Sequence, residues 1–198
     1  QILDAVAHSQ VVVLSGETGC GKSTQLPAYL LEDALQRGYP CKIYVTEPRR
    51  ISAISLAERV SQELGEARGA IGGPDSYVGY AIRLDSQVGR NARLIYATTG
   101  IALRMLESSS FDEITHIIID EVHERSIESD FLLMVLKVLM QERPNLKVVL
   151  MSATLDAGRI SEYFGGCPML QVPGRTFPVD EYYLEDVVEM CDYTPEPN

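Results

Sequence analysis

Residues 11–24 read VVVLSGETGCGKST, a short β-branched run that passes directly into a glycine-rich loop. From Gly16 to Ser23 the loop fits the pattern G-x-x-x-x-G-K-[S/T] at every position. Apolar residues at spacings of three and four follow from Thr24 to Gln36, and this spacing indicates a helix. A strand, a loop of this pattern and a helix together predict a site for the phosphates of a nucleotide.

The same alternation of strand and helix continues along the chain. The expected strands are Val11–Leu14, Lys42–Thr46, Leu94–Thr98, His116–Asp120 and Val148–Ser152, and the expected helices are Thr24–Gln36, Ile51–Leu64, Ile101–Leu106 and Asp130–Gln141. This order predicts an α/β fold with a mainly parallel sheet and helices on both faces. Ligands of such sheets bind beyond the carboxyl ends of the strands.

Two segments fit the alternation less well. Residues 77–85 (YVGYAIRLD) are shorter and β-like. After Phe164 the alternation stops, because glycines and prolines interrupt the chain up to Pro178. We therefore expect one domain over residues 1–178, ending in an edge segment, and an acidic linker over residues 179–198.

Composition narrows the class of protein. The chain has 198 residues, of which 45% are hydrophobic and 23% charged, as in an ordinary globular domain. Its longest apolar run, Phe131–Leu136, is too short to span a bilayer, and no signal peptide is visible, so no membrane partner is expected. The start on Gln1 suggests a piece of a longer protein. The four cysteines are scattered without a CxxC pair, which favours a reduced, intracellular and cytoplasmic setting.

The net charge of −11 argues at first against a nucleic-acid partner. Residues 179–198 alone carry seven acidic and no basic residues, so the remaining 178 residues have a net charge of only −4. Local clusters such as Arg49-Arg50 can still meet phosphate groups.

Each position of the glycine-rich loop has an expected role. Backbone N–H groups of Gly16, Thr18, Gly19, Cys20, Gly21 and Thr24 turn toward phosphate oxygens, Lys22 carries charge to the β- and γ-phosphates, and Ser23 offers its hydroxyl to Mg²⁺. Cys20 is expected to be a small loop residue without a catalytic role. A dinucleotide fingerprint is excluded because Thr24 stands where that pattern needs Gly or Ala.

Residues 115–125 read THIIIDEVHER, a buried strand that runs straight into charged residues. A phosphate loop with a metal ion needs an acidic partner, and Asp120 at the strand end is placed to hold Mg²⁺. Glu121 is expected to contact the same metal site and to deprotonate the water that attacks the γ-phosphate. A zinc-protease motif is excluded, because HExxH would need a histidine at Ile127.

Five motifs in this order, GETGCGKST, TEPRR, TTG, DEVH and SAT, resemble motifs I, Ia, Ib, II and III of DEAH/RHA-type helicases of superfamily 2. The resemblance covers nearly the whole chain and is closest to the RHA-like branch, which includes helicases associated with translation initiation. It implies a RecA-like P-loop fold, ATP and Mg²⁺ as cofactors, and RNA as partner, with DNA also possible. A ribosome or other ribonucleoprotein is a further implied partner.

The resemblance also implies roles for single residues. Arg59 would stack on the adenine, and Arg49 or Arg50, Arg83 and Thr98 would hold the RNA backbone. His123, Ser152 and Thr154 would couple the nucleotide state to domain movement. Two features depart from the family: Val122 replaces the usual alanine of motif II, and Glu47 stands where glutamine is usual, which adds negative charge near the expected RNA path. The family's second RecA-like domain and its accessory domains are not in these residues.

Three functions remain open from the sequence. The first is the nucleotide-binding RecA-like domain of an RNA-dependent ATPase and helicase. The second is a small-molecule P-loop kinase, in which TEPRR, TTG and SAT would have no evident role. The third is a module that binds nucleotide without turnover.

Overall fold

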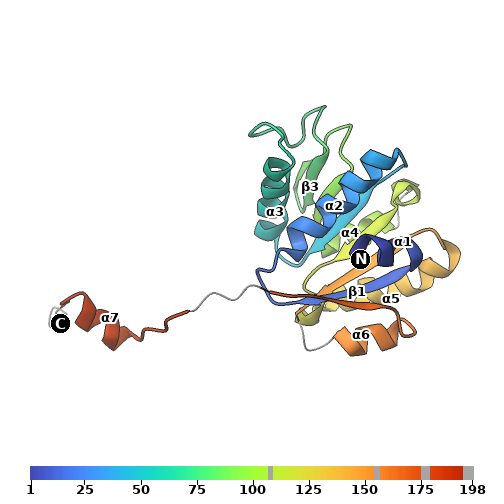
Figure 1. The fold of residues 1–198 in the computed structure, drawn as a ribbon. Helices are drawn as coiled ribbons and strands as arrows, with labels where there is room; N and C mark the ends of the chain where they lie inside the picture. Colours follow the sequence, from blue (N-terminus) through green and yellow to red (C-terminus); the bar gives the residue numbers. More distant parts are fainter. Residues whose placement is uncertain (107–108, 154–156, 175–178, 194–198) are drawn as a thin grey trace.

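The computed structural model describes residues 1–106, 109–153, 157–174 and 179–193, in which eight strands form one sheet (Figure 1). The strands are β1 (Val11–Gly16), β2 (Ile43–Glu47), β3 (Val78–Ile82), β4 (Asp85–Gln87), β5 (Leu94–Thr98), β6 (His116–Ile119), β7 (Lys147–Ser152) and β8 (Met169–Val172). Their order is β4-β3-β5-β2-β6-β7-β1-β8, and every neighbouring pair is parallel except β3 and β4. The expected α/β fold with a mainly parallel sheet is confirmed.

Helices cover both faces of this sheet (Figure 1). Helices α1 (Ile2–His8), α2 (Lys22–Arg37) and α3 (Arg50–Glu63) lie on one face, and α4 (Thr99–Leu106), α5 (Ile127–Glu142) and α6 (Ala157–Tyr163) lie on the other. Two short 3₁₀ helices, η1 (Ser109–Glu113) and η2 (Val122–Glu124), precede and follow β6. This layering is the RecA-like arrangement that the motifs imply.

Successive residues of each central strand pack alternately into two separate hydrophobic cores, one on each face of the sheet. On β1, Val12 and Leu14 pack with α1, α2 and α3, whereas Val11 and Val13 pack with the helices of the other face. Because successive side chains of a strand point to opposite faces, a strand buried on both faces must be apolar throughout. This requirement accounts for the unbroken isoleucines of β6.

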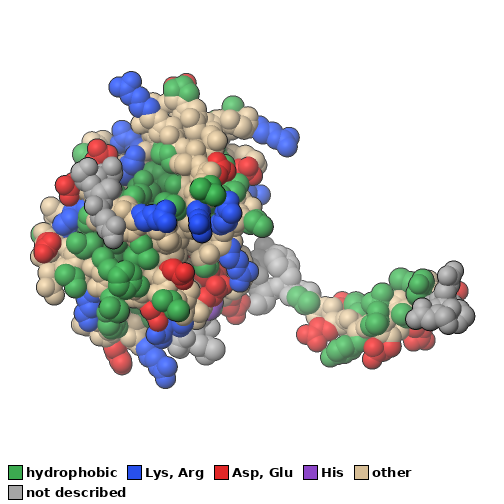
Figure 2. Space-filling model, turned by 180° about the vertical axis from the view of Figure 1, so that it is seen from behind, with side chains coloured by type: hydrophobic (Ala, Val, Ile, Leu, Met, Phe, Trp, Pro, Cys, Tyr) green, Lys and Arg blue, Asp and Glu red, His purple; other side chains and the backbone are tan. Residues whose placement is uncertain are grey.

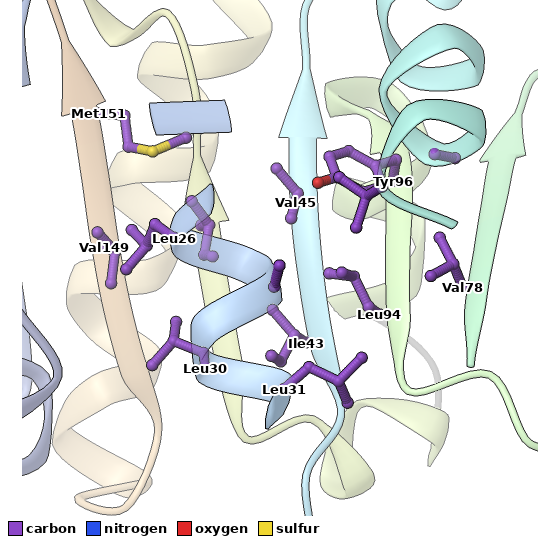
Figure 3. Close-up of a cluster of buried hydrophobic side chains, with 14 of the residues drawn as sticks. Leu26, Leu30, Leu31, Ile43, Val45, Val78, Leu94, Tyr96, Val149 and Met151 are labelled. Atoms are coloured by element: carbon purple, nitrogen blue, oxygen red, sulfur yellow. The ribbon is translucent and has the colours of Figure 1, made fainter. Parts of the chain in front are cut away.

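Figure 3 shows the first of these cores. Leucines of α2 lie over side chains from four strands: Leu26, Leu30 and Leu31 face Ile43, Val45, Val78, Leu94, Tyr96, Val149 and Met151. Burial of one such leucine or isoleucine contributes about 1.5–3 kcal/mol. The core therefore fixes α2, and with it the loop between β1 and α2, against the middle of the sheet.

The observed elements differ from the expected ones mainly at their ends. Helix α5 begins at Ile127 rather than Asp130, because Ser126 caps it by accepting a 3.1 Å hydrogen bond from the N–H of Ser129. Residues 77–85 form β3 and the start of β4, two strands of an antiparallel hairpin. The expected edge segment after Phe164 contains β8, which pairs in parallel with β1 at the margin of the sheet.

The acidic C-terminal segment contains helix α7 (Leu184–Met190), which buries no residue. It stands apart from the sheet in Figure 1, and acidic and hydrophobic side chains share its surface in Figure 2. The division into a domain of residues 1–178 and a linker of residues 179–198 stays a prediction. No helix in the described part of the chain is long and apolar enough to cross a membrane.

Candidate nucleotide-binding site

The loop between β1 and α2 has the backbone that a phosphate cradle needs. Gly19 and Gly21 have φ values of 83° and 85°, which favour glycine over residues with a side chain. A Cβ atom at Gly16 would lie 2.9 Å from the carbonyl oxygen of Val172, so the edge strand β8 leaves room for glycine alone. Helix α2 starts at Lys22 without a side-chain cap, which leaves N–H groups of its first turn facing the loop.

The side chain of Lys22 folds back over this loop. Its Nζ atom donates hydrogen bonds of 2.8 and 2.9 Å to the carbonyl oxygens of Gly16 and Glu17, and it lies 3.5 Å from Sγ of Cys20. The ammonium group is thus already at the mouth of the loop, where phosphate oxygens would replace the carbonyl partners. The hydroxyl and the N–H of Thr24 both donate to the carbonyl oxygen of Gly21, at 3.2 and 3.3 Å, and the expected contact of this N–H with phosphate stays a prediction.

The carboxyl end of β6 meets the same loop. Asp120 is buried; its Oδ2 accepts a hydrogen bond from the hydroxyl of Ser23, and its Oδ1 accepts one of 2.8 Å from the N–H of Glu121. Ser23 is held in turn, because its carbonyl oxygen accepts a 2.8 Å bond from the hydroxyl of the buried Tyr96. The two residues expected to hold a metal ion, about 100 positions apart in sequence, are therefore in direct contact.

Glu121 has an unusual backbone and a perturbed side chain. Its φ of 52° places a residue other than glycine in the left-handed region, a strain that proteins retain mainly at functional sites. Partial burial, and next the negative charge of Asp120, raise the pKa of the Glu121 carboxyl above its ordinary value. A carboxylate of raised pKa is a stronger base, as the abstraction of a proton from water requires.

His123 joins this cluster to the end of β7. Its Nδ1 accepts a 3.1 Å hydrogen bond from the N–H of Ala153, so Nδ1 is unprotonated and the hydrogen of the neutral ring is on Nε2. Nε2 lies 3.2 Å from Oε2 of Glu121 and can donate to it. Ser152, buried beside this contact, donates its hydroxyl to the carbonyl oxygen of Ala153 at 2.7 Å. Thr154 lies outside the described residues.

Glu47 behaves differently from the expectation that it adds negative charge near the RNA path. Only 2% of the residue is exposed, and its Oε1 atom has no hydrogen-bond partner among the described residues. Burial, followed by the charge of Asp120, raises the pKa of Glu47 from 4.5 to about 9. The side chain is therefore uncharged at neutral pH and resembles the glutamine usual in the family, because burial makes ionisation too costly.

Most of these groups line one cavity of about 660 Å³ at the carboxyl ends of β2 and β6. Its walls include Thr18, Ser23, Glu47, Arg49, Arg59, Asp120, Glu121, His123 and Glu124. The structure thus brings together the phosphate loop, the acidic end of β6, Arg49 after β2 and Arg59 of α3. Asp120 and Glu121 supply negative charge on one wall, and Arg59 on α3 supplies positive charge on another.

The other expected RNA contacts lie along the edge of the sheet next to this cavity. Arg50 begins α3 after β2, Thr98 ends β5, and Arg83 follows β3. Because β3, β5 and β2 are neighbours and parallel, these residues lie along one side of the molecule, at strand spacings of about 4.8 Å. Arg49 joins this edge to the cavity through a 3.0 Å ion pair with Glu124.

Two further glutamates hold arginines of the site, and the sequence motifs do not single them out. Glu63 accepts hydrogen bonds from Arg59 and from Gln25, and Glu124 holds Arg49. For Glu63, the spacing of four residues from Arg59 on one helix was a usable signal. For Glu124 no local signal existed, since its partner is 75 residues away.

The sequence of the chain is similar to those of known helicases. A family model described as "DEAD/DEAH box helicase" matches residues 1–162. The chain is 51% identical over 97% of its length to "DExH-box ATP-dependent RNA helicase DExH3" of Arabidopsis thaliana and 52% identical over 97% to "Putative ATP-dependent RNA helicase DHX57" of Homo sapiens. It is 48% identical over 99% of its length to "ATP-dependent DNA/RNA helicase DHX36" of Homo sapiens. The chain covers 16%, 14% and 19% of these three relatives, so it spans less than a fifth of their length.

Proposed function

Because the chain belongs to the DEAD/DEAH box helicase family, we propose that it is the first RecA-like, ATP-binding motor domain of an ATP-dependent RNA helicase. The observation that carries this proposal is the direct hydrogen bond between Ser23 of the phosphate loop and Asp120 at the end of β6, with Glu121 beside it. Ser23 comes from motif I, the two acidic residues come from motif II, and the three form one constellation.

In this proposal the loop residues Gly16–Thr24 bind the triphosphate. Lys22 exchanges the carbonyl oxygens of Gly16 and Glu17 for β- and γ-phosphate oxygens, and the first turn of α2 adds its N–H groups. Arg59, on the cavity wall formed by α3, stacks on the base. A stacking guanidinium reads any base face, so the site binds ATP without strong selection among nucleotides.

The donor groups present fit Mg²⁺ bound together with a nucleotide. Among the residues that the structure describes, no group of three or more His, Cys, Asp or Glu side chains could hold a metal alone. Mg²⁺ at nucleotide sites takes only one or two protein groups besides phosphate and water, and the Ser23 hydroxyl and the Asp120 carboxylate supply those two. When bound, the ion neutralises the charge that develops on the phosphate oxygens.

Glu121 orients the attacking water and accepts its proton. The raised pKa of its carboxyl suits this role, and His123 holds the carboxylate by donating from Nε2. Because the same imidazole accepts from the N–H of Ala153, a change at the γ-phosphate is transmitted to the segment after β7. We propose that this path, with Ser152 and Thr154, couples hydrolysis to domain movement.

We propose that RNA lies along the edge formed by Arg49, Arg50, Arg83 and Thr98 and is held through its backbone, with little base specificity. The printed names of relatives include both RNA and DNA helicases, so single-stranded DNA is a second candidate substrate. A second RecA-like domain and accessory domains would close the cavity and supply further arginines. A ribosome or ribonucleoprotein is the broader partner that we propose.

ATP hydrolysis measured with and without single-stranded RNA tests this function, in a protein that spans the full length of the relatives. We expect turnover that RNA stimulates strongly. Phosphate transfer from ATP to a small metabolite, with no response to RNA, would instead support a P-loop kinase. Tight binding of ATP with no release of phosphate under either condition would support a binding module.

A further inference from the structure

Helix α3 carries an ion pair at the rim of the nucleotide cavity. The position of this pair is a poor one for stabilising the helix. Nε of Arg59 donates a 2.6 Å hydrogen bond to Oε1 of Glu63, one turn further along. Glu63 is the last residue of α3, where the negative end of the helix dipole disfavours a carboxylate. The order is also the weaker one, since acid before base is the favourable direction at this spacing.

A third residue makes the arrangement specific. Nε2 of Gln25 donates a 3.0 Å hydrogen bond to Oε2, the second carboxylate oxygen of Glu63. Gln25 belongs to the first turn of α2 and lies directly under the phosphate loop, because a Cβ atom at Gly21 would come within 3.3 Å of its Cγ atom. The carboxylate of Glu63 is thus held between the helix of the phosphate loop and the arginine on the cavity wall.

The geometry of the bond suits a stacking arginine. The Nε–H group lies in the plane of the guanidinium, so a hydrogen bond to it fixes the rotation of that plane and leaves both faces free. Two-thirds of the Arg59 side chain is exposed, and without a partner it would sample many rotamers. Arg59 lines the cavity together with Thr18 and Ser23, whereas Glu63 and Gln25 do not.

We propose that Glu63, braced by Gln25, is a positioning residue that presents the face of Arg59 to the nucleotide base. This inference rests on the proposed function, in which Arg59 stacks on that base. Glu63 itself touches no part of the nucleotide. Glu63 lowers the entropy cost of ordering Arg59 when the base binds. Through its bond to Gln25 of α2, it also fixes the position of Arg59 relative to the phosphate loop.

Binding of Mg²⁺-ATP and of inorganic tripolyphosphate, which lacks a base, tests the role of Glu63 in a protein of the relatives' full length. We expect Glu63→Ala to weaken ATP binding about threefold, the cost of ordering one long side chain. Tripolyphosphate binding should stay unchanged. In steady state the KM for ATP rises while kcat holds, as expected when only ground-state binding is lost. Glu63→Gln, which keeps an acceptor oxygen for Nε, should restore most of the loss.

A double-mutant cycle with Arg59→Ala separates positioning from a structural effect. If Glu63 acts only through Arg59, Glu63→Ala has no further effect in the Arg59→Ala background. Asp33→Ala is the matched control, because Asp33 pairs with Arg37 at the same spacing on α2 but away from the cavity, and it should leave both affinities unchanged.

Three results would overturn the inference. If Arg59→Ala itself leaves the preference for ATP over tripolyphosphate unchanged, the stacking role in the proposed function fails, and positioning fails with it. If Arg59→Ala shows the effect and Glu63→Ala does not, positioning alone is wrong. Equal weakening of ATP and tripolyphosphate by Glu63→Ala would mean that Glu63 supports the phosphate loop and not Arg59.

Discussion

Two parts of the carboxyl edge of the sheet differ in how firmly their side chains are held. The nucleotide edge is the part proposed to bind ATP, at the phosphate loop, Asp120 and His123. The arginine edge is the part proposed to bind RNA, at Arg49, Arg50 and Arg83. At the nucleotide edge, Lys22, Asp120 and His123 each have at least two hydrogen-bond or ion-pair partners within the domain. At the edge proposed for RNA, Arg50 and Arg83 have no ion-pair partner within the described part of the chain, and Arg49 has a single exposed one.

This difference fits two kinds of binding. Transition-state stabilisation needs groups that are fixed before the reaction, because the free energy of reorganising them would add to the activation barrier. Contact with a nucleic-acid backbone needs only positive charge within reach of phosphates, and flexible arginines provide it. Substitutions at the nucleotide edge should therefore have large and specific effects, and those at the arginine edge small and additive ones.

Glu121→Gln should have the largest effect. In a protein of the relatives' full length we expect turnover to fall by about 10²–10⁴, the range typical of losing a general base. ATP binding should be retained, since the amide keeps the size of the side chain and the contact with His123. Single-turnover phosphate release and equilibrium ATP binding measure the two quantities separately.

Glu128→Gln, the same change at an exposed position in the first turn of α5, is the control for Glu121→Gln. Turnover of the Glu121 variant near that of this control would mean that another group activates the water. Loss of ATP binding in the Glu121 variant would mean that the strained backbone at this position depends on the carboxylate.

Lys22→Ala should be next in size. Removing the ammonium should weaken ATP binding on the order of 100-fold, because the phosphates lose a charge-assisted partner in a site built around it. The fold should remain, since Lys22 bonds only groups of its own loop. Calorimetric titration with ATP and the thermal unfolding midpoint measure the two effects.

Lys137→Ala is the matched control for Lys22→Ala. Lys137 also donates to a backbone carbonyl, that of Tyr163, but on the far side of the sheet. Equal ATP affinity in the two variants would mean that Lys22 does not contact the phosphates of ATP.

Glu47→Gln concerns the buried neighbour of Asp120 and should change stability more than affinity. The pKa of Glu47 is about 9 in the folded state, against 4.5 ordinarily, so its contribution to stability is complete below pH 4.5. That contribution is lost as pH rises from 4.5 through 9, because the unfolded chain then releases a proton that the folded chain keeps. Without Mg²⁺ and nucleotide, we expect Glu47→Gln to be the more stable protein at pH 8.

Denaturant unfolding at several pH values measures this difference. The wild type should lose up to about 1.4 kcal/mol per pH unit relative to Glu47→Gln. Glu32→Gln, on the exposed face of α2, should run parallel to the wild type at every pH. A Glu47→Gln protein that is less stable at pH 8 would show that Glu47 is ionised and paired in the fold.

The nucleotide edge was also the part most readable from sequence, and for a physical reason. Strand, glycine loop and helix are local, so the loop from Gly16 to Ser23 and the acids after the β6 isoleucines could be identified from spacing alone. The parallel sheet followed from the alternation of strands and helices. Element ends were less predictable, because the start of α5 depends on the cap at Ser126.

What the sequence could not show depends on tertiary contacts. The pKa of Glu47 depends on its burial at the carboxyl end of β2 and on the charge of Asp120 at the end of β6, and a pattern of residues does not report burial of one carboxylate. The link from His123 to Ala153 joins two motifs 30 residues apart through a backbone N–H, which has no sequence signature. Edge strand β8 is short and partly exposed, so it lacks the apolar run that marked the central strands.

Arg49→Ala should have the smallest effect and tests the arginine edge itself. Its single exposed ion pair with Glu124 is worth little, so most of its side chain is available to a phosphate. We expect this chain, with a net charge of −11, to bind single-stranded RNA weakly, and Arg49→Ala to weaken it a few-fold without changing sequence preference. Losing one phosphate contact should reduce the log–log salt slope by roughly 0.7.

RNA titrations at several salt concentrations measure the slope for Arg49→Ala, and Arg68→Ala is the control. Arg68 is exposed in the loop before β3, outside the cavity, and its removal changes the net charge by the same amount. If the slope falls equally in both variants, only the overall charge matters, and the edge is not a binding surface. If it falls in neither, Arg49 contacts no phosphate. Glu124→Gln sharpens the comparison: freed from its partner, Arg49 should bind RNA slightly more tightly, because the carboxylate no longer competes with phosphate for the same guanidinium.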